Sequence, residues 1–413
     1  MRTKPSVYAA IACALALGLS SVAPAHAAKA KEKSLYSFKA GDDGAFPQGN
    51  VVIDAQRNIF GVTESGGGAG CGGGGCGVVF KLARGGSETV LHAFQAGDDG
   101  AFPIAGPVMD AAGNLYGATL NGGAHCGCGT IYKITPDGAE TVVYAFRGGK
   151  DGASPLGQLA IDAKGNLYGT TSAGGVDCNG FGVGCGTVFE FEPATGKHKV
   201  LHSFAGGGGD GVYPAAGVTP GKDGAFYGTT ANGGLDCDGT GQGCGVVYRV
   251  TAKGDEKVLY AFAGGGAGAY PAAGVAIDGD GALWGTTNNG GVDCDGSGAG
   301  CGVAYKLAQD GTETSLHVFK GGDDGAYPRA TPYLDGQGNA YATTAEGGGA
   351  NDGGVVFRID AGGKEQIVYS FQGGEDGGGP FSGLTADAVG DLYGTTFAGG
   401  AFASGAVYRL KLR

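Results

Sequence analysis

Short runs of alternating apolar and polar residues recur seven times along this chain. In the third repeat the run 167–171 reads Leu-Tyr-Gly-Thr-Thr, and close variants of it occupy equivalent places in the other six. Alternation with a period of two residues is typical of a half-buried β-strand. The runs contain β-branched and aromatic residues and are bounded by glycine, which also favours strands.

Each repeat contains four such strand-like runs. In the third they are residues 157–161, 167–171, 187–191 and 199–204, separated by two short polar turns and one glycine-rich loop. No repeat contains a convincing helical pattern. The sequence therefore predicts an all-β protein built from four-stranded units.

The repeat length identifies the architecture. Each unit ends its fourth strand in a phenylalanine, and successive phenylalanines are 52 to 58 residues apart. Seven antiparallel units of this length predict a seven-bladed β-propeller. The chain begins with a fourth-type strand at 35–38 and ends with a third-type strand at 406–410. We therefore expect the last blade to close with three C-terminal strands and one N-terminal strand, which removes exposed sheet edges.

The order G-N-L-Y-G-T-T, then GG, then G-T-V-F/Y-K, then L-x-x-F resembles the GloVer tandem-repeat family. These are exported bacterial proteins, also described as choice-of-anchor repeat proteins, and the resemblance covers about residues 34–413. It supplies no catalytic residues to carry over. Some members end in a membrane or surface-sorting segment, whereas this sequence stops at Lys411-Leu412-Arg413. We therefore expect a soluble protein without a membrane anchor, and we separately expect it to be a monomer.

The N-terminal 27 residues predict a secretory signal peptide. Arg2 and Lys4 precede an apolar run, and Ala25-His26-Ala27 is a typical cleavage site. An uncleaved membrane anchor is the alternative. A short segment, 28–33, would then precede one propeller domain, 34–413, in a secreted or periplasmic protein.

Composition and charge limit the partners. The chain has 413 residues with 93 glycines, whose fixed places in the repeat favour a folded array over disorder. Without Arg2 and Lys4, 25 basic residues face 39 acidic ones, a net charge of −14. This balance argues against binding nucleic acid or an anionic membrane, and it permits cations or neutral glycans.

Ten cysteines of the mature chain lie in local pairs, as expected for disulfides in an exported protein. The predicted pairs are Cys71/Cys76, Cys178/Cys185, Cys237/Cys244, Cys294/Cys301 and Cys126/Cys128. A bridge across one residue is strained. A metal site that includes His125 is the alternative for that last pair.

The longer connections, between strands two and three and from one blade to the next, must emerge on the same face. Long loops on a rigid scaffold are where binding and catalysis usually occur. The blade-to-blade connections repeat a Gly-Asp-Asp-Gly-Ala-Phe-Pro motif. Its aspartates are the candidate ligand-binding residues: Asp43, Asp99, Asp151, Asp210, Asp324 and Asp376.

Two functions fit this face. The first is a non-enzymatic module that binds a glycan or a protein partner. The second is a polysaccharide hydrolase or lyase that uses two of the carboxylates. The structural interpretation is that the aspartates form turns and the neighbouring aromatic residues fill gaps between blades. We find no known catalytic motif and predict no catalytic residue and no cofactor beyond calcium.

Calcium is a candidate because three cysteine loops carry aspartates next to glycine, and hard cations take oxygen ligands. The candidate ligands are Asp236, Asp238, Asp293 and Asp295. Ordinary Asx turns are the alternative. His92, His202 and His317 occupy a strand position that is tyrosine in other repeats, so we interpret it as a packing or hydrogen-bonding site.

Overall fold

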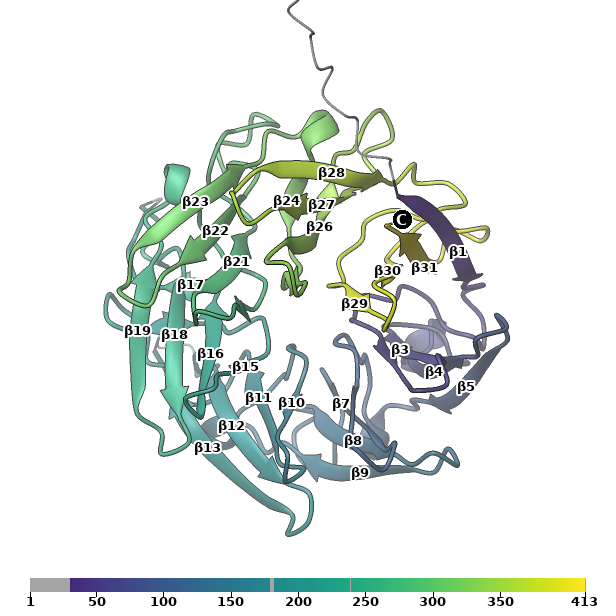
Figure 1. The fold of residues 1–413 in the computed structure, drawn as a ribbon. Coiled ribbons are helices and arrows are strands. Elements are labelled where there is room, and N and C mark those ends of the chain that lie inside the picture. Colours follow the sequence, from purple (N-terminus) through teal and green to yellow (C-terminus); the bar gives the residue numbers. More distant parts are fainter. Residues whose placement is uncertain (1–29, 179–181, 238, 413) are drawn as a thin grey trace, which may run out of the picture.

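The computed structural model describes residues 30–178, 182–237 and 239–412, which form a closed ring of seven antiparallel blades (Figure 1). Every blade has four main strands, and in the six blades built from continuous sequence they pair in chain order. The seven-bladed propeller predicted from the repeats is therefore confirmed. The predicted signal peptide, residues 1–27, lies outside the described residues.

The first four blades have these strands. Blade 1 contains β2 (Val52–Ile53), β3 (Ile59–Thr63), β4 (Val78–Leu82) and β5 (Glu88–Ala93). Blade 2 contains β6 (Val108–Met109), β7 (Leu115–Thr119), β8 (Thr130–Ile134) and β9 (Glu140–Ala145). Blade 3 contains β10 (Ala160–Ile161), β11 (Leu167–Thr171), β12 (Thr187–Glu192) and β13 (Lys197–Ser203). Blade 4 contains β15 (Thr219–Pro220), β16 (Ala225–Thr230), β18 (Val246–Thr251) and β19 (Glu256–Ala261).

The remaining blades follow the same plan. Blade 5 contains β20 (Ala276–Ile277), β21 (Leu283–Thr287), β22 (Val303–Leu307) and β23 (Glu313–Val318). Blade 6 contains β25 (Tyr333–Leu334), β26 (Ala340–Glu346), β27 (Val355–Ile359) and β28 (Glu365–Ser370). Blade 7 contains β29 (Thr385–Ala386), β30 (Leu392–Thr396), β31 (Ala406–Lys411) and β1 (Lys31–Ser37). Additional short pairings join β14 (Gly211–Val212) to β17 (Asn232–Gly233) and β24 (Ala326–Pro328) to β26.

The N-terminal strand closes the ring. β1 pairs antiparallel with β31, from Lys31 opposite Lys411 to Ser37 opposite Ala406. This confirms the expected closure of three strands by one. β1 begins at Lys31, so the propeller takes in the last residues of the segment 28–33, which the sequence placed ahead of it.

Aromatic contacts between neighbouring blades hold the ring together. The phenylalanine after each fourth strand is almost completely buried and packs edge-to-face against an aromatic residue on the third strand of the next blade. Ring centroids lie 4.9 to 5.3 Å apart, in the range that favours aromatic pairs. The seven pairs are Phe38–Phe80, Phe94–Tyr132, Phe146–Phe189, Phe204–Tyr248, Phe262–Tyr305, Phe319–Phe357 and Phe371–Tyr408.

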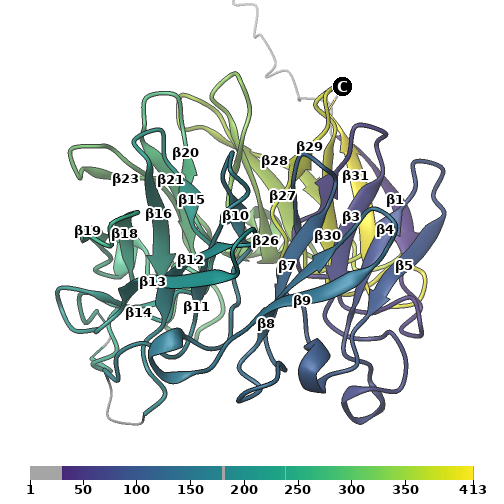
Figure 2. The same cartoon turned by 90° about the horizontal axis from the view of Figure 1, so that it is seen from below.

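The two faces of the ring differ. Figure 2 shows tight hairpin turns and the C-terminus on the upper face, and longer loops with 3-10 turns on the lower face. We call the lower one the loop face. The 3-10 turns are η1 (Cys71–Gly73), η2 (Gly97–Asp99), η3 (Gly149–Asp151), η4 (Gly265–Ala267) and η5 (Gly322–Asp324).

The blade-to-blade connections run close to the strands beneath them. Gly100 has φ near +100°, and a Cβ there would lie 2.6 Å from the Thr119 hydroxyl oxygen. Only glycine fits this position without displacing the connection. The repeated Gly of the Asp-Gly-Ala motif is thus explained by close backbone approach rather than by flexibility.

Candidate functional site

The central channel opens on the loop face through residues that differ from blade to blade. A cavity of about 360 Å³ is lined by residues from all seven blades. In each blade-to-blade connection, the residue that follows the repeated proline lines this cavity. A second set lies nearby and consists of the residue that follows the Thr-Thr pair, or its equivalent, at the end of each second strand. We call these two sets the channel mouth. They are Gln48, Ile104, Leu156, Ala215, Ala272, Arg329 and Phe381, and Glu64, Leu120, Ser172, Ala231, Asn288, Ala345 and Phe397.

This divergence is unusual within the repeat. Flanking positions keep the same proline, glycine and threonine in almost every blade because the backbone geometry requires them. Channel-mouth positions vary between charged, amide, aliphatic and aromatic side chains. Sequence reasoning missed these residues, although the variation itself was a signal that could have located them.

Polar and aromatic side chains gather on one side of the mouth, on blades 6, 7 and 1. The Arg329 guanidinium donates through Nε to Asn288 Oδ1 at 2.9 Å and lies 5.3 Å from the centre of the Phe381 ring. Phe381 packs against Phe397 at 5.2 Å between ring centroids. Phe397 in turn stacks on Phe46 at 5.0 Å.

The same arc continues with amide side chains. Gln48 donates through Nε2 to Glu64 Oε2 at 2.5 Å. Deeper in the channel, Asn50 donates to the side-chain oxygen of Gln158 at 3.0 Å and accepts from the backbone N–H of Gly383 at 2.6 Å. Gln158 donates onward to the Pro107 carbonyl at 3.2 Å. Blades 1, 2, 3 and 7 are thus linked by hydrogen bonds across the channel.

The opposite side of the mouth is small and apolar. Its post-proline residues, on blades 2 to 5, are Ile104, Leu156, Ala215 and Ala272. Pockets with a mainly apolar lining and a few fixed polar groups are typical of small-ligand sites. The mouth offers one cation, several amides and an aromatic surface to a ligand.

The aspartates that the sequence suggested as ligand-binding residues lie elsewhere, between the outer strands of neighbouring blades. Each carboxylate meets the tyrosine or histidine on the preceding fourth strand, and each accepts a backbone N–H from its own connection. For example, the Tyr36 hydroxyl donates to Asp43 at 2.7 Å, and the Lys39 N–H donates to the same oxygen at 3.0 Å. The other five are similarly held: Asp99, Asp151, Asp210, Asp324 and Asp376.

A third residue completes each of these six clusters, and the equivalent place between blades 4 and 5 has Tyr260, Ala267 and a third residue but no aspartate. We call all seven places junctions. The third residue comes from the start of the fourth strand of the following blade and is glutamate except in blade 3, where it is His198. The His198 ring stacks on Tyr144, and its Nδ1 lies 3.2 Å from Asp151 Oδ1. Burial lowers the pKa of His198, against the opposing charge of Asp151. The glutamates are Glu32, Glu88, Glu140, Glu256, Glu313 and Glu365.

The histidines that alternate with tyrosine therefore have a defined place. His92, His202 and His317 each direct Nε2 to the junction aspartate, at 3.0, 3.4 and 3.0 Å. This agrees with the interpretation of a hydrogen-bonding position. A β-bulge lies immediately before it in each blade, and bulges commonly redirect a side chain.

All five predicted disulfides are present: Cys71–Cys76, Cys126–Cys128, Cys178–Cys185, Cys237–Cys244 and Cys294–Cys301. Both sulfurs beside His125 are bonded to each other in this structure. Such crosslinks restrict the conformational entropy of glycine-rich loops.

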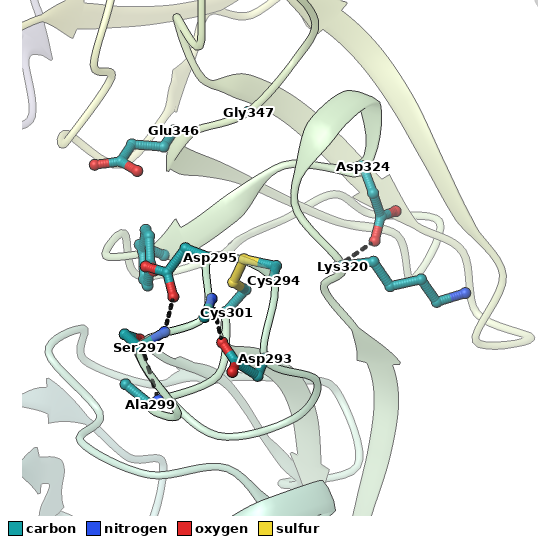
Figure 3. The surroundings of a disulfide bond; sticks show 12 residues. Asp293, Cys294, Asp295, Ser297, Ala299, Cys301, Lys320, Asp324, Glu346 and Gly347 are labelled. Atoms are coloured by element: carbon teal, nitrogen blue, oxygen red, sulfur yellow. Dashed lines mark hydrogen bonds between the residues drawn. A yellow bond between two sulfur atoms is a disulfide. The ribbon is translucent and has the colours of Figure 1, made fainter.

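The calcium candidates lie on these cysteine loops. Figure 3 shows Asp293 and Asp295 beside the Cys294–Cys301 bridge, turned toward backbone N–H groups of their own loop. Asp293 accepts from Gly296 at 2.9 Å, and Asp295 accepts from Ser297 at 2.8 Å and from the Tyr327 hydroxyl. Asp236 likewise accepts from Gly239 at 3.0 Å, whereas Asp238 lies outside the described residues. These contacts are Asx-type turns, and calcium remains an untested prediction.

A second cavity, of about 620 Å³, lies on the opposite face between blades 4 and 5. The turn between the first and second strands of blade 4 forms part of its wall. In the other blades this turn begins with an aspartate, whereas in blade 4 that position is Gly221 and the aspartate, Asp223, comes two residues later. Asp223 accepts from Arg249 Nε at 2.9 Å and from the Tyr227 hydroxyl at 3.0 Å. The Asp223–Arg249 ion pair lies in the wall of this cavity, together with Lys222 and Lys257.

Comparison with known proteins identifies the repeats. A model of the Gloeobacter/Verrucomicrobia repeat matches residues 23–181, 72–297 and 238–413, which together span nearly the whole chain. The chain belongs to the Gloeobacter/Verrucomicrobia repeat family. The resemblance drawn from the repeat motif is confirmed. A search of curated proteins found no similar sequence.

Several solved structures are similar to this family member. Two are extracellular domains from B. thetaiotaomicron, described as belonging to a hybrid two component system and a one component system, with TM-scores of 0.58 and 0.56. Both are 10% identical to the chain and are matched over 92% of it. The chain spans about two fifths of their length, 39% and 40%. TolB from Acinetobacter baumannii is 15% identical, with a TM-score of 0.42, over 75% of this chain and 62% of that one.

No helix in the described residues is long and apolar enough to cross a bilayer.

Proposed function

We propose that this protein is an exported, non-enzymatic binding module whose channel mouth binds a glycan. The observation that carries the proposal is that the blades diverge in side-chain chemistry where they converge on the channel. In a ring of near-identical units, a binding site that selects one ligand needs residues that break the repeat.

The chemistry of the mouth favours a sugar. Arg329, Gln48 and Asn50 supply donors and acceptors for hydroxyl groups. Phe381 and Phe397 supply apolar ring surface against which the face of a pyranose can pack. A cavity of about 360 Å³ is at the lower end of the size range of small-ligand sites. We therefore expect a terminal sugar unit to bind, rather than a long internal segment of a polysaccharide.

Hydrolysis by the Asp-Gly motif has less support. Glycoside hydrolysis requires two carboxyl groups on either side of the scissile bond. The junction aspartates instead accept hydrogen bonds from their own connections and lie between outer strands. We therefore treat a hydrolase or lyase activity only as one outcome of the binding experiment described below.

Export is supported by the disulfides. Five local bridges suit an oxidising compartment, and thiols in the bacterial cytoplasm are kept reduced. With the predicted signal peptide, they favour a secreted or periplasmic location.

Binding and turnover on a glycan array, with purified mature protein with and without calcium, test the proposal. Arg329→Ala and Phe381→Ala should each weaken binding of a retained glycan by about tenfold or more. Lys222→Ala, in the cavity on the opposite face, is the matched control and should leave binding unchanged. Melting temperatures of all three variants establish that they are folded.

Chain shortening of a bound glycan would show the hydrolase or lyase instead. Retention that is unaffected by both mouth variants would place the glycan site elsewhere and refute the mouth. No binding to any glycan would also refute it, and a protein partner would then become the leading hypothesis.

A further inference from the structure

Three of the seven junctions bring together a histidine, an aspartate and a glutamate from two neighbouring blades. In each, a histidine nitrogen and one oxygen from each carboxylate lie within 4.8 Å of one another. The three triads are His92–Asp99–Glu140, His202–Asp210–Glu256 and His317–Asp324–Glu365. None of the three belongs to the channel mouth.

The glutamates of these triads contain an unsatisfied group. One oxygen of each carboxylate, Oε1 of Glu140, Glu256 and Glu365, is buried and has no hydrogen-bond partner. The same is true of Glu32 and Glu88 at two junctions without a histidine, so the histidine is what distinguishes the triads. An acceptor shielded from water without a donor or cation costs free energy. Among the described residues, no protein donor satisfies this glutamate oxygen in any of the three triads.

We propose that each His–Asp–Glu triad binds one divalent transition-metal ion, with Zn²⁺ the expected ion, and so links adjacent blades. One imidazole nitrogen and two carboxylate oxygens are a donor set that zinc accepts, with the fourth position left to water. The imidazole favours such an ion over calcium or magnesium, which prefer oxygen ligands alone. A divalent ion would also neutralise the two carboxylates and satisfy the glutamate oxygen.

The chain supplies its own controls. The remaining four junctions have Tyr36, Tyr144, Tyr260 or Tyr369 in place of the histidine, and the same backbone forms around them. Substituting tyrosine for a triad histidine therefore copies an arrangement that this fold already accommodates. A phenol is a poor zinc ligand at neutral pH because its pKa is near 10.

The experiment measures zinc stoichiometry on the full mature protein, without a polyhistidine tag, after treatment with EDTA. Titration with ZnCl₂ against a competing chromogenic chelator should give about three ions per chain. His92→Tyr, His202→Tyr and His317→Tyr should each lower the number by one, and the triple variant should bind none. His125→Ala, beside a disulfide and outside all triads, should retain all three.

Thermal melting provides a second readout. Zinc should raise the melting temperature of the wild-type protein and leave that of the triple variant unchanged, because only the native state holds the triads together. Wild-type protein that binds no zinc at micromolar concentration would overturn the proposal. The same follows if the triple variant keeps its zinc, or if the zinc is lost in His125→Ala.

Discussion

The two junctions that flank the closing strand differ from the other five. β1 contributes Tyr36 to the junction with Asp43 and Glu88, and it contributes Glu32 to the junction with Tyr369 and Asp376. Both combine two carboxylates with a tyrosine and no histidine. In three of the other five junctions a histidine accompanies the two carboxylates. In the remaining two, one carboxylate is missing: His198 replaces the glutamate in blade 3, and Ala267 replaces the aspartate in blade 5.

The charges of these two junctions are correspondingly less balanced. Burial, followed by the charge of Asp376, raises the pKa of Glu32 to about 7. Burial and Asp43 likewise raise the pKa of Glu88 to about 7, against the opposing charge of Lys39. In the triad of blades 1 and 2, His92 partly offsets the rise in the pKa of Glu140. The comparison teaches that uncompensated carboxylate pairs are concentrated at the strand that closes the ring.

Removing the closing strand should have the largest effect. A chain that begins at residue 39 lacks β1 and Phe38, so blade 7 loses its outer strand and the aromatic contact between Phe38 and Phe80. We expect the melting temperature to fall by on the order of 10 °C or more, measured by circular dichroism. A chain that begins at residue 30 is the control. Equal melting temperatures of the two chains would show that closure contributes little to stability.

Removing a junction aspartate should be costly at a histidine junction and less so beside β1. Asp99→Asn weakens the contacts to His92 and to the Gln95 N–H, which should cost about 1–3 kcal/mol in the free energy of unfolding. Asp43→Asn loses similar contacts. Both substitutions relieve repulsion of the neighbouring glutamate, Glu88 or Glu140. Only Asp99 also faces a histidine, so the cost of Asp43→Asn should be smaller. Urea unfolding of both variants in EDTA measures the difference. Equal costs would contradict the comparison.

The stability of the ring should fall as pH rises from about 4.5 to 7. A carboxyl whose pKa is higher in the folded protein binds its proton more tightly there, so its contribution is complete below the unfolded value and lost as pH passes about 7. The groups facing Glu32 are Asp376, Tyr369 and Tyr408, and those facing Glu88 are Asp43, Tyr36 and Lys39.

Glu32→Gln and Glu88→Gln together should flatten this dependence, by on the order of 1 kcal/mol for each group after allowance for solvent screening. Melting temperatures measured from pH 4.5 to 8 in both proteins provide the check. Parallel curves for the wild type and the double variant would show that these two glutamates do not cause the slope.

The smallest effect is expected from completing the junction of blade 5. Ala267→Asp restores the aspartate beside Tyr260 and Glu313, on a 3-10 turn that already has the required shape. The new carboxylate should compete with Glu313 for the hydrogen bond of the Tyr260 hydroxyl and should repel Glu313. We therefore expect less than about 1 kcal/mol of change in unfolding free energy near neutral pH, together with a new decrease in stability between pH 5 and 7. Absence of that decrease would contradict the role given to paired carboxylates.

The strand order, the number of blades and the closure could be predicted from the sequence because the same strand pattern recurs seven times. Strand 167–171 was placed at its observed bounds, and closure followed from the strand types at the two ends. First strands were expected to be longer than they are. In blade 3 only Ala160 and Ile161 pair with β11, and residues 156–159 before them line the channel without pairing to that strand.

The candidate site was harder to predict because it depends on ring closure. Gln48, Arg329 and Phe381 are far apart in sequence, and only the closed ring brings them to one cavity. The aspartates were easier to notice because they recur. Tyr36 and Asp43 are seven residues apart, and this spacing did not reveal their hydrogen bond. The bond forms only because the bulge and the turn between the two residues bring their side chains together.

The antiparallel closure has a mechanical consequence. Lys31 and Lys411 are paired at one end of the β1–β31 ladder, so both chain ends leave the ring at the same edge. Tension between the termini would therefore load the hydrogen bonds one rung at a time, as in opening a zipper, rather than all together in shear. When held from both ends, the propeller should open at low force by peeling β1 away, while the six blades of continuous sequence bear no direct load.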